Sequence, residues 1–169
     1  MKKSIITLVF AFFAICSVFA QGRFSVGPEL ALPMGNFGDA FGLGIGGSAR
    51  YEGTINDNLN WMATAGYISY AEKNSSGVTA SMIPIQGGIK YYFTESFNGF
   101  YASGDLGFSI VGAKASFLGQ SLSTSETKFS LAPGIGYHLG SIDISARYQI
   151  ISDASYLGFR VAYVFGGAK

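Results

Sequence analysis

Hydrophobic residues alternate with small or polar residues along most of the chain after residue 23. In the last such run, 155–165, the positions at every second residue are Leu157, Phe159, Val161, Tyr163 and Phe165. Arg160 lies between two of them. A period of two is typical of a β-strand with apolar surroundings on one face and polar surroundings on the other. The pattern therefore predicts a strand whose arginine faces away from the apolar side.

The same alternation recurs between groups of turn residues and predicts an all-β chain. The expected strands are 24–32, 42–53, 59–70, 82–93, 100–110, 128–139, 142–151 and 155–165. Each is close to the roughly 9 to 11 residues that a tilted transmembrane strand needs. Met62 and Ile68 interrupt the alternation of the third strand. After the first twenty residues, Gly, Ser or a charge ends every apolar run before about 18 residues, so only strands could span a membrane.

The connecting segments predict how such a barrel is oriented. Most alternate in length, with short links at 55–58, 94–98 and 140–141 and longer ones at 33–41, 71–81 and 112–127. Outer-membrane barrels have short periplasmic turns and longer external loops. An even strand count then leaves both termini in the periplasm. The short link 152–154 departs from this pattern.

Aromatic residues cluster at the strand ends that this orientation assigns to the periplasm. They are Tyr51, Trp61, Tyr91, Phe93, Phe100, Tyr137, Tyr163 and Phe165. Aromatic rings are enriched where a barrel meets the membrane interface. The sequence therefore predicts an eight-stranded antiparallel up-and-down transmembrane β-barrel.

The first twenty residues have the layout of a secretory signal peptide. Lys2 and Lys3 precede an apolar run, and small residues lead to Ala20, so we expect residues 1–20 to be a signal peptide and 21–169 the barrel domain. Cys16, the single cysteine, lies in the segment to be removed. A lipid-anchored alternative needs a small residue before that cysteine, and Ile15 is not small.

Composition separates the chain from an ordinary soluble domain. Charged residues make up 12% of it, against about 25% in typical globular chains, and 24 of 169 residues are glycine. The formal net charge is +1, which gives no electrostatic reason to expect a nucleic-acid partner.

The inward positions of the expected strands collect four basic and four acidic residues. This predicted lumen charge network comprises Glu29, Arg50, Glu52, Lys90, Asp105, Asp143, Arg147 and Arg160. The interior of an eight-stranded barrel is just wide enough to be filled by side chains. Isolated buried charges are costly, so we expect these groups to pair and form a polar plug. The alternative is a narrow path for ions or protons.

Few residue patterns in the chain indicate catalysis or ligand binding, and we expect no enzyme, no catalytic residue, no metal and no cofactor. His138, the single histidine, could meet Ser130, Ser145 and Asp143 on neighbouring strands, but no nucleophile motif frames a serine. One histidine and no mature cysteine do not favour a metal site. The glycine-rich stretch 42–47 lacks the following helix that a phosphate-binding loop requires.

Three segments carry a resemblance to a known family: IPIQGGIKYYF (83–93), GFYASGDLGFS (99–109) and LGFRVAYVF (157–165). With them the chain resembles the small outer membrane protein β-barrel domain family, the eight-stranded, porin-like group of Gram-negative bacteria. The resemblance implies location in the cell outer membrane, with membrane lipid and the barrel assembly machinery as partners. Family barrels commonly end on an aromatic that this machinery reads, whereas four residues follow Phe165 here.

Our first hypothesis for function is an integral outer-membrane protein with a structural or surface-interaction role and a plugged lumen. The polar loops 72–80 and 115–126, the latter with Phe117 and Leu118, are the candidate surface for an extracellular ligand. The first alternative is a narrow porin for ions or small solutes. The second is a soluble, lipocalin-like ligand-binding barrel, which would turn its apolar face inward.

Overall fold

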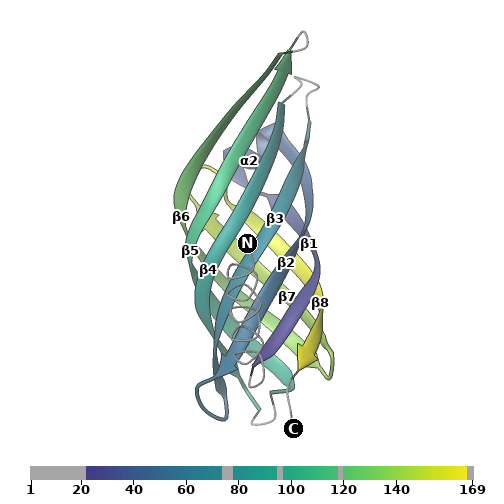
Figure 1. The fold of residues 1–169 in the computed structure, drawn as a ribbon, viewed down its shortest axis with the longest axis vertical. Coiled ribbons are helices and arrows are strands. Elements are labelled where there is room, and N and C mark those ends of the chain that lie inside the picture. The colour runs from purple at the N-terminus through teal and green to yellow at the C-terminus, as the bar shows by residue number, and fades with distance from the viewer. Residues whose placement is uncertain (1–21, 74–77, 95–96, 118–119, 167–169) are drawn as a thin grey trace, which may run out of the picture.

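The computed structural model describes residues 22–73, 78–94, 97–117 and 120–166. Eight antiparallel strands form a closed barrel in sequence order, with β8 paired to β1 (Figure 1). The elements are β1 (Arg23–Pro33), α2 (Gly35–Ala40), β2 (Phe41–Thr54), β3 (Leu59–Glu72), β4 (Val78–Tyr92), β5 (Gly99–Phe117), β6 (Gln120–Leu139), β7 (Ile142–Ile151) and β8 (Tyr156–Gly166). The predicted eight-stranded up-and-down fold is confirmed.

The alternation in sequence becomes two faces of the barrel wall. On β8, Phe159 is 43% and Val161 51% exposed, whereas Arg160 between them is 3% exposed. Successive side chains of a strand point to opposite faces, so a period of two places one class outside and the other inside. A ring of apolar side chains facing outward suits lipid. The soluble, lipocalin-like alternative, which requires the opposite arrangement, is wrong.

Aromatic side chains band the outside of the barrel at the end that carries the short turns. Rings of neighbouring positions touch there: the centroids of Tyr51 and Trp61 are 5.3 Å apart, and those of Phe100 and Tyr137 are 4.8 Å apart. Such a girdle marks the membrane interface of a barrel. Among the described residues, no helix is both long and apolar enough to cross a membrane.

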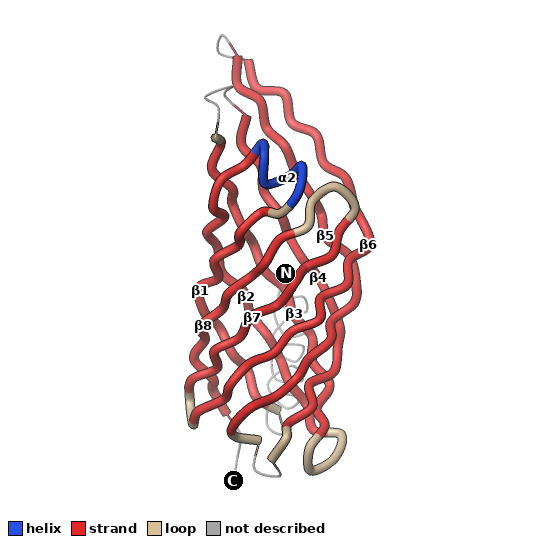
Figure 2. The backbone as a smooth tube through the Cα atoms, turned by 180° about the vertical axis from the view of Figure 1, so that it is seen from behind, coloured by secondary structure: helices blue, strands red, loops and turns tan. Residues whose placement is uncertain are grey.

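The segment 112–127, predicted as a loop, is mostly strand. β5 continues to Phe117 and β6 begins at Gln120, and the two remain paired from Phe117↔Gln120 downward. Alternation in sequence indicates that one face of a strand is buried. On the inner side of this hairpin Val111 and Ala113 of β5 lie opposite polar positions of β6, which are Thr124, Glu126 and Lys128, so no continuous apolar face marks it. The backbone ladder therefore continues where the hydrophobic signal stops. In Figure 2 the two strands extend past the other elements, at the end of the barrel opposite the short turns.

The two other long connections also differ from plain loops. Segment 33–41 contains α2, a short helix at the end of the barrel opposite the short turns (Figure 2). The predicted orientation makes this end the extracellular mouth. Segment 71–81 is shortened because β3 runs to Glu72 and β4 starts at Val78. A helix of six residues is too short to show a helical period in the sequence.

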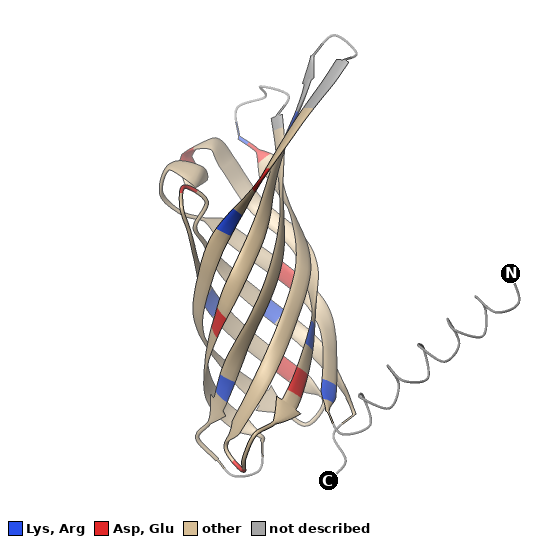
Figure 3. Ribbon diagram, turned by 60° about the vertical axis from the view of Figure 1, so that its left-hand side comes forward, with Lys and Arg blue, Asp and Glu red and all other residues tan. Residues whose placement is uncertain are grey.

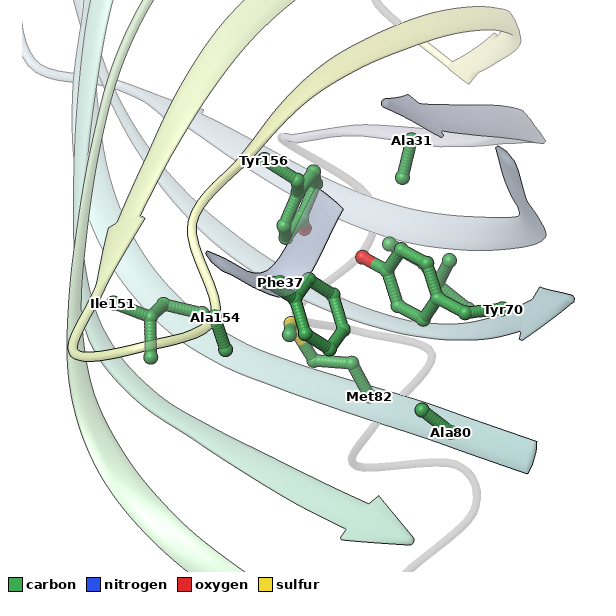
Figure 4. Packing of buried hydrophobic residues seen from close by; sticks show 9 residues of the cluster. Ala31, Phe37, Tyr70, Ala80, Met82, Ile151, Ala154 and Tyr156 are labelled. Atoms are coloured by element: carbon green, nitrogen blue, oxygen red, sulfur yellow. The ribbon is translucent and has the colours of Figure 1, made fainter. Parts of the chain in front are cut away.

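The extracellular mouth is closed by a buried apolar cluster, here called the mouth cap. Its members are Ala31, Phe37, Ile68, Tyr70, Ala80, Met82, Ile151, Ala154 and Tyr156 (Figure 4). Ile68, which broke the predicted alternation of β3, points inward into this cap, and Met62 likewise points inward below it, so the interior is not polar throughout. The short turn after β7 contributes Ala154 to the cap, which gives that unexpected connection a packing role.

Ile151→Val should lower the free energy of unfolding by about 0.5–1.5 kcal/mol, because it removes a methylene group from the packed cap. Ile150→Val, one residue earlier on β7, is the matched control. Ile150 faces outward and is 43% exposed, so we expect a smaller loss there. Urea unfolding of the two variants in the same detergent measures the difference. Equal losses would contradict the packing of the cap.

Candidate functional site

All eight members of the lumen charge network are buried, with exposures of 1–6%. They come from β1, β2, β4, β5, β7 and β8, and charged positions of both signs lie at several levels along the barrel (Figure 3). Strands on opposite sides of the barrel thus contribute side chains to one interior.

The centre of the lower level is Lys90 on β4. Its Nζ lies 2.8 Å from Oε1 of Glu52 on β2 and 2.7 Å from Oδ2 of Asp143 on β7. The Tyr101 hydroxyl donates to Oδ1 of Asp143 at 2.9 Å, and Lys90 Nζ lies 3.9 Å from the centroid of the Tyr101 ring. None of β2, β4 and β7 is adjacent to another, so these contacts cross the interior of the barrel.

A second group of contacts lies nearer the mouth cap. Nη2 of Arg147 on β7 donates to Oε1 of Glu29 on β1 at 2.6 Å, and the Tyr156 hydroxyl lies 3.4 Å from the same nitrogen. Arg50 on β2 reaches Asp105 on β5 at 4.0 Å and donates through Nε to Thr64 at 3.1 Å. These contacts tie strands of the wall together at this level too. The buried charges are tolerated there because they are paired.

Arg160 links the seam between β8 and β1 to the rest of the network. Its guanidinium donates to the hydroxyl oxygens of Ser48 and Ser25, both at 2.9 Å. It also lies 3.6 Å from Oδ1 of Asp143. The seam that closes the barrel is therefore bridged by a side chain as well as by backbone pairing.

Sequence reasoning missed Arg23, which closes the periplasmic end of the network. Its Nη2 lies 3.4 Å from Oε2 of Glu52, and its guanidinium carbon is 4.9 Å from the centroid of the Phe97 ring. Arg23 shares the inward parity of Ser25 and Glu29 on β1. The signal was present, but the expected strand began one residue too late to include it.

His138 belongs to this periplasmic closure, where its ring contacts a backbone carbonyl group and a tyrosine. Its Nδ1 lies 2.6 Å from the carbonyl oxygen of Phe97 and 3.4 Å from the Tyr92 hydroxyl. Ser130, which lies on the same strand and was considered as a possible partner, accepts a hydrogen bond from Gln86 at 3.1 Å. Within the described ranges no serine hydroxyl is bonded to His138, and no group of three His, Cys, Asp or Glu residues comes together for a metal ion.

The extracellular end carries a second feature, the projecting hairpin formed by β5 and β6 above Ser130. The pairing of β6 with β7 starts at Ser130↔Ile151, whereas β6 is paired with β5 up to Gln120. In the described part of the chain, residues 120–129 of β6 therefore have a strand neighbour on one side only. An unpaired strand edge presents N–H and C=O groups that can pair with another chain. The hairpin is the part that rises highest in Figure 1.

Of the two loops expected to form the external surface, 115–126 falls mainly in this hairpin. Leu118 and residues 74–77 of the other loop lie outside the described residues. In the sequence of segments 33–41, 71–81, 111–129 and 152–155 the basic residues are Lys73, Lys114 and Lys128. The acidic residues are Asp39, Glu72, Glu126 and Asp153, so the extracellular surface is not basic.

Several solved outer-membrane barrels have a similar fold. Ail, the attachment invasion locus protein of Yersinia pestis, matches with a TM-score of 0.64 at 18% identity, over 85% of this chain and 97% of Ail. The N-terminal β-barrel domain of Pseudomonas aeruginosa OprF matches with a TM-score of 0.55 at 12% identity, over 86% of this chain and 98% of that domain. OprG from the same organism matches with a TM-score of 0.51 at 12% identity, over 88% and 98%.

No curated protein sequence matches the chain. The family model of the outer membrane protein beta-barrel domain, however, matches residues 6–165, nearly the whole chain. The closed barrel, its apolar outer face and its aromatic girdle are what such a protein requires. The chain belongs to the outer membrane protein beta-barrel domain family and is an integral β-barrel protein of the outer membrane.

Proposed function

We propose that this protein acts at the cell surface as an interaction module, in which the filled barrel is the anchor and the projecting hairpin is the binding element. The observation that carries the proposal is the unpaired edge of β6 above Ser130. An extended polypeptide can add to such an edge as a further strand, with affinity from main-chain hydrogen bonds. The partner would then be an external protein that presents an extended segment.

The charges of the extracellular surface favour this partner over a sulfated glycan. Ail has been solved in complex with the heparin analogue sucrose octasulfate. In this protein the extracellular segments contain three lysines and four acidic residues, so they would attract a highly anionic ligand only weakly. Recognition through backbone groups does not depend on that charge.

The proposed role of the lumen is mechanical. Ion pairs such as Lys90 on β4 with Asp143 on β7 cross the lumen between strands that are not neighbours, which supports a rigid anchor rather than a narrow porin. We propose no catalytic activity, because His138 and the lumen carboxylates are engaged with tyrosine, lysine and backbone groups. Reconstitution in a planar bilayer should accordingly give no discrete channel steps.

Export and insertion would follow the route of other barrels. We propose that residues 1–20 are removed after secretion, and that the barrel assembly machinery reads the aromatic residues at the end of β8. Phe165 is the last outward aromatic of that strand and is 48% exposed. Membrane lipid would then cover the apolar outer face.

Removing the projecting hairpin tests the binding role. Gly112 and Ser125 are opposite each other in the ladder, so residues 113–124 can be replaced by an Asn-Gly turn that closes the shortened hairpin. We expect the variant to keep its heat-modifiable gel mobility, which reports a folded barrel. Because only residues 125–129 of the free edge remain, the variant should bind a fluorescent peptide that alternates threonine and valine much more weakly, as measured by anisotropy in nanodiscs.

The same peptide with N-methyl groups on alternate amides is the control for the type of binding. It keeps the side chains and loses the donors that pair with the edge. Because each lost hydrogen bond is worth about 0.5–1.5 kcal/mol, affinity should fall by about tenfold or more. Equal binding of both peptides, or unchanged binding after removal of the hairpin, would contradict strand addition at β6.

A further inference from the structure

At the foot of the projecting hairpin, a cavity of about 190 Å³ lies between its inner face and the mouth cap. Val111 of β5, Phe37 of α2 and Ala154 of the turn after β7 supply apolar lining. Pockets for drug-sized ligands are typically about 300–1,000 Å³. The space is therefore suited to one side chain of a larger partner.

The charged lining of this cavity is unbalanced. Lys128 Nζ lies 3.4 Å from Oε2 of Glu126 and 3.7 Å from Oδ2 of Asp153. The same nitrogen donates to the carbonyl oxygen of Ser152 at 3.1 Å. Glu126 and Asp153 are 72% and 82% exposed, whereas Lys128 is 20% exposed. Two accessible carboxylates thus share one ammonium group that is already engaged, and the cavity retains a negative charge.

The register of β6 shows how an added strand would meet these carboxylates. Below the cavity, β6 pairs with β7 as Ser130↔Ile151, and the same register would place Lys128 opposite residue 153. The chain instead leaves the ladder in the turn after β7, where Asp153 has a φ of 60°. A strand added to β6 would take up the position that β7 vacates. Its inward side chain opposite Glu126 would lie over the cavity.

We propose that this cavity selects a lysine or arginine in the extended polypeptide that adds to β6. The inference rests on the proposed function, since it assumes strand addition at the same edge. The aliphatic part of the side chain would lie against the apolar lining, and its cationic end would pair with Glu126 and Asp153. An acidic side chain in the same position would meet two carboxylates and be disfavoured.

Two peptides that differ at one position test the selectivity. Both alternate threonine and valine, and the central residue is lysine in one and glutamate in the other. In nanodiscs at low salt we expect the lysine peptide to bind about tenfold more tightly, and the difference should shrink as salt screens the exposed carboxylates. Glu126→Lys should abolish or reverse the preference. Asp39→Lys, an exposed acidic position on α2 that does not line the cavity, is the matched control and should leave it unchanged.

The outcomes separate this inference from the proposed function. If neither peptide binds, strand addition fails and the selectivity fails with it. If both bind equally, or if Glu126→Lys leaves the preference intact, the edge still binds polypeptide but the cavity does not select a cation. Heat-modifiable gel mobility of each variant shows that its barrel has folded. The salt dependence of the lysine preference can be measured with the unmodified protein and so tests the inference without any variant.

Discussion

Replacing Lys90 by methionine should lower the free energy of unfolding by about 3–5 kcal/mol, the largest effect we expect from one substitution in the lumen. Lys90 is 1% exposed and is bonded to both Glu52 and Asp143. Methionine fills a similar volume, so the loss comes from leaving two buried carboxylates without their shared cation. Urea unfolding in lipid vesicles, followed by tryptophan fluorescence and gel mobility, measures it.

Lys114→Met is the control, because Lys114 is exposed on the projecting hairpin and its replacement should change stability by less than about 0.5 kcal/mol. Adding Glu52→Gln to Lys90→Met should recover part of the loss, since one of the two carboxylates that lost the lysine is then neutral. Coupling of this kind is expected for residues in direct contact. A loss below about 1 kcal/mol for Lys90→Met would show that the network contributes little to the stability of the barrel.

The second large effect is expected on the outside of the barrel. Leu106 on β5 is 57% exposed, and its neighbours in the ladder are Gly87 and Leu131. It lies between the periplasmic aromatic Phe100 and the upper end of the apolar face near Ile110. Leu106→Arg should therefore destabilise the folded protein by about 2–4 kcal/mol, because an arginine near the middle of the bilayer is poorly solvated.

The effect should depend on depth in the membrane. Thr127→Arg introduces the same charged side chain at the upper edge of the apolar face, opposite Ile110 on β5, and should cost about 0–1 kcal/mol. Comparing the two variants in vesicles and in urea separates lipid exposure from a general intolerance of arginine. If both positions tolerate arginine equally well, the outer face near Leu106 does not contact lipid tails.

The barrel interior shows how much of the charge network could be predicted from the sequence. Parity along each strand was enough to place Glu29, Arg50 and Arg160 inside, because a strand turns successive side chains to opposite faces. Which cation meets which anion could not be read in this way. The contact between Arg147 and Glu29 joins residues 118 positions apart, and it depends on how far the strands are tilted and staggered when the barrel closes.

At the extracellular end, by contrast, the sequence indicated little of the arrangement that the structure shows. The mouth cap depends on Phe37, which lies in a segment with no periodic signal, and on Ile68, whose apolar character seemed to break the pattern of its strand. Both residues become intelligible only when the barrel brings α2, β3 and the turn after β7 together. The long β5 and β6 extensions were hidden for a related reason, since backbone pairing continues there although the inward positions of β6 are polar.

The sequence by itself determined the barrel, its strand number, its lipid-facing side and the identity of the buried charges. These follow from local rules, because alternation, turn residues and connector length act within or between neighbouring strands. The tertiary structure alone decided the partners of those charges, the apolar closure of the mouth and the free edge of β6. The charge partners and the mouth cap join strands distant in sequence, whose relative positions become fixed only once β8 pairs with β1. The free edge depends on how far β6 extends past the end of β7, which the backbone pairing decides and the hydrophobic pattern does not.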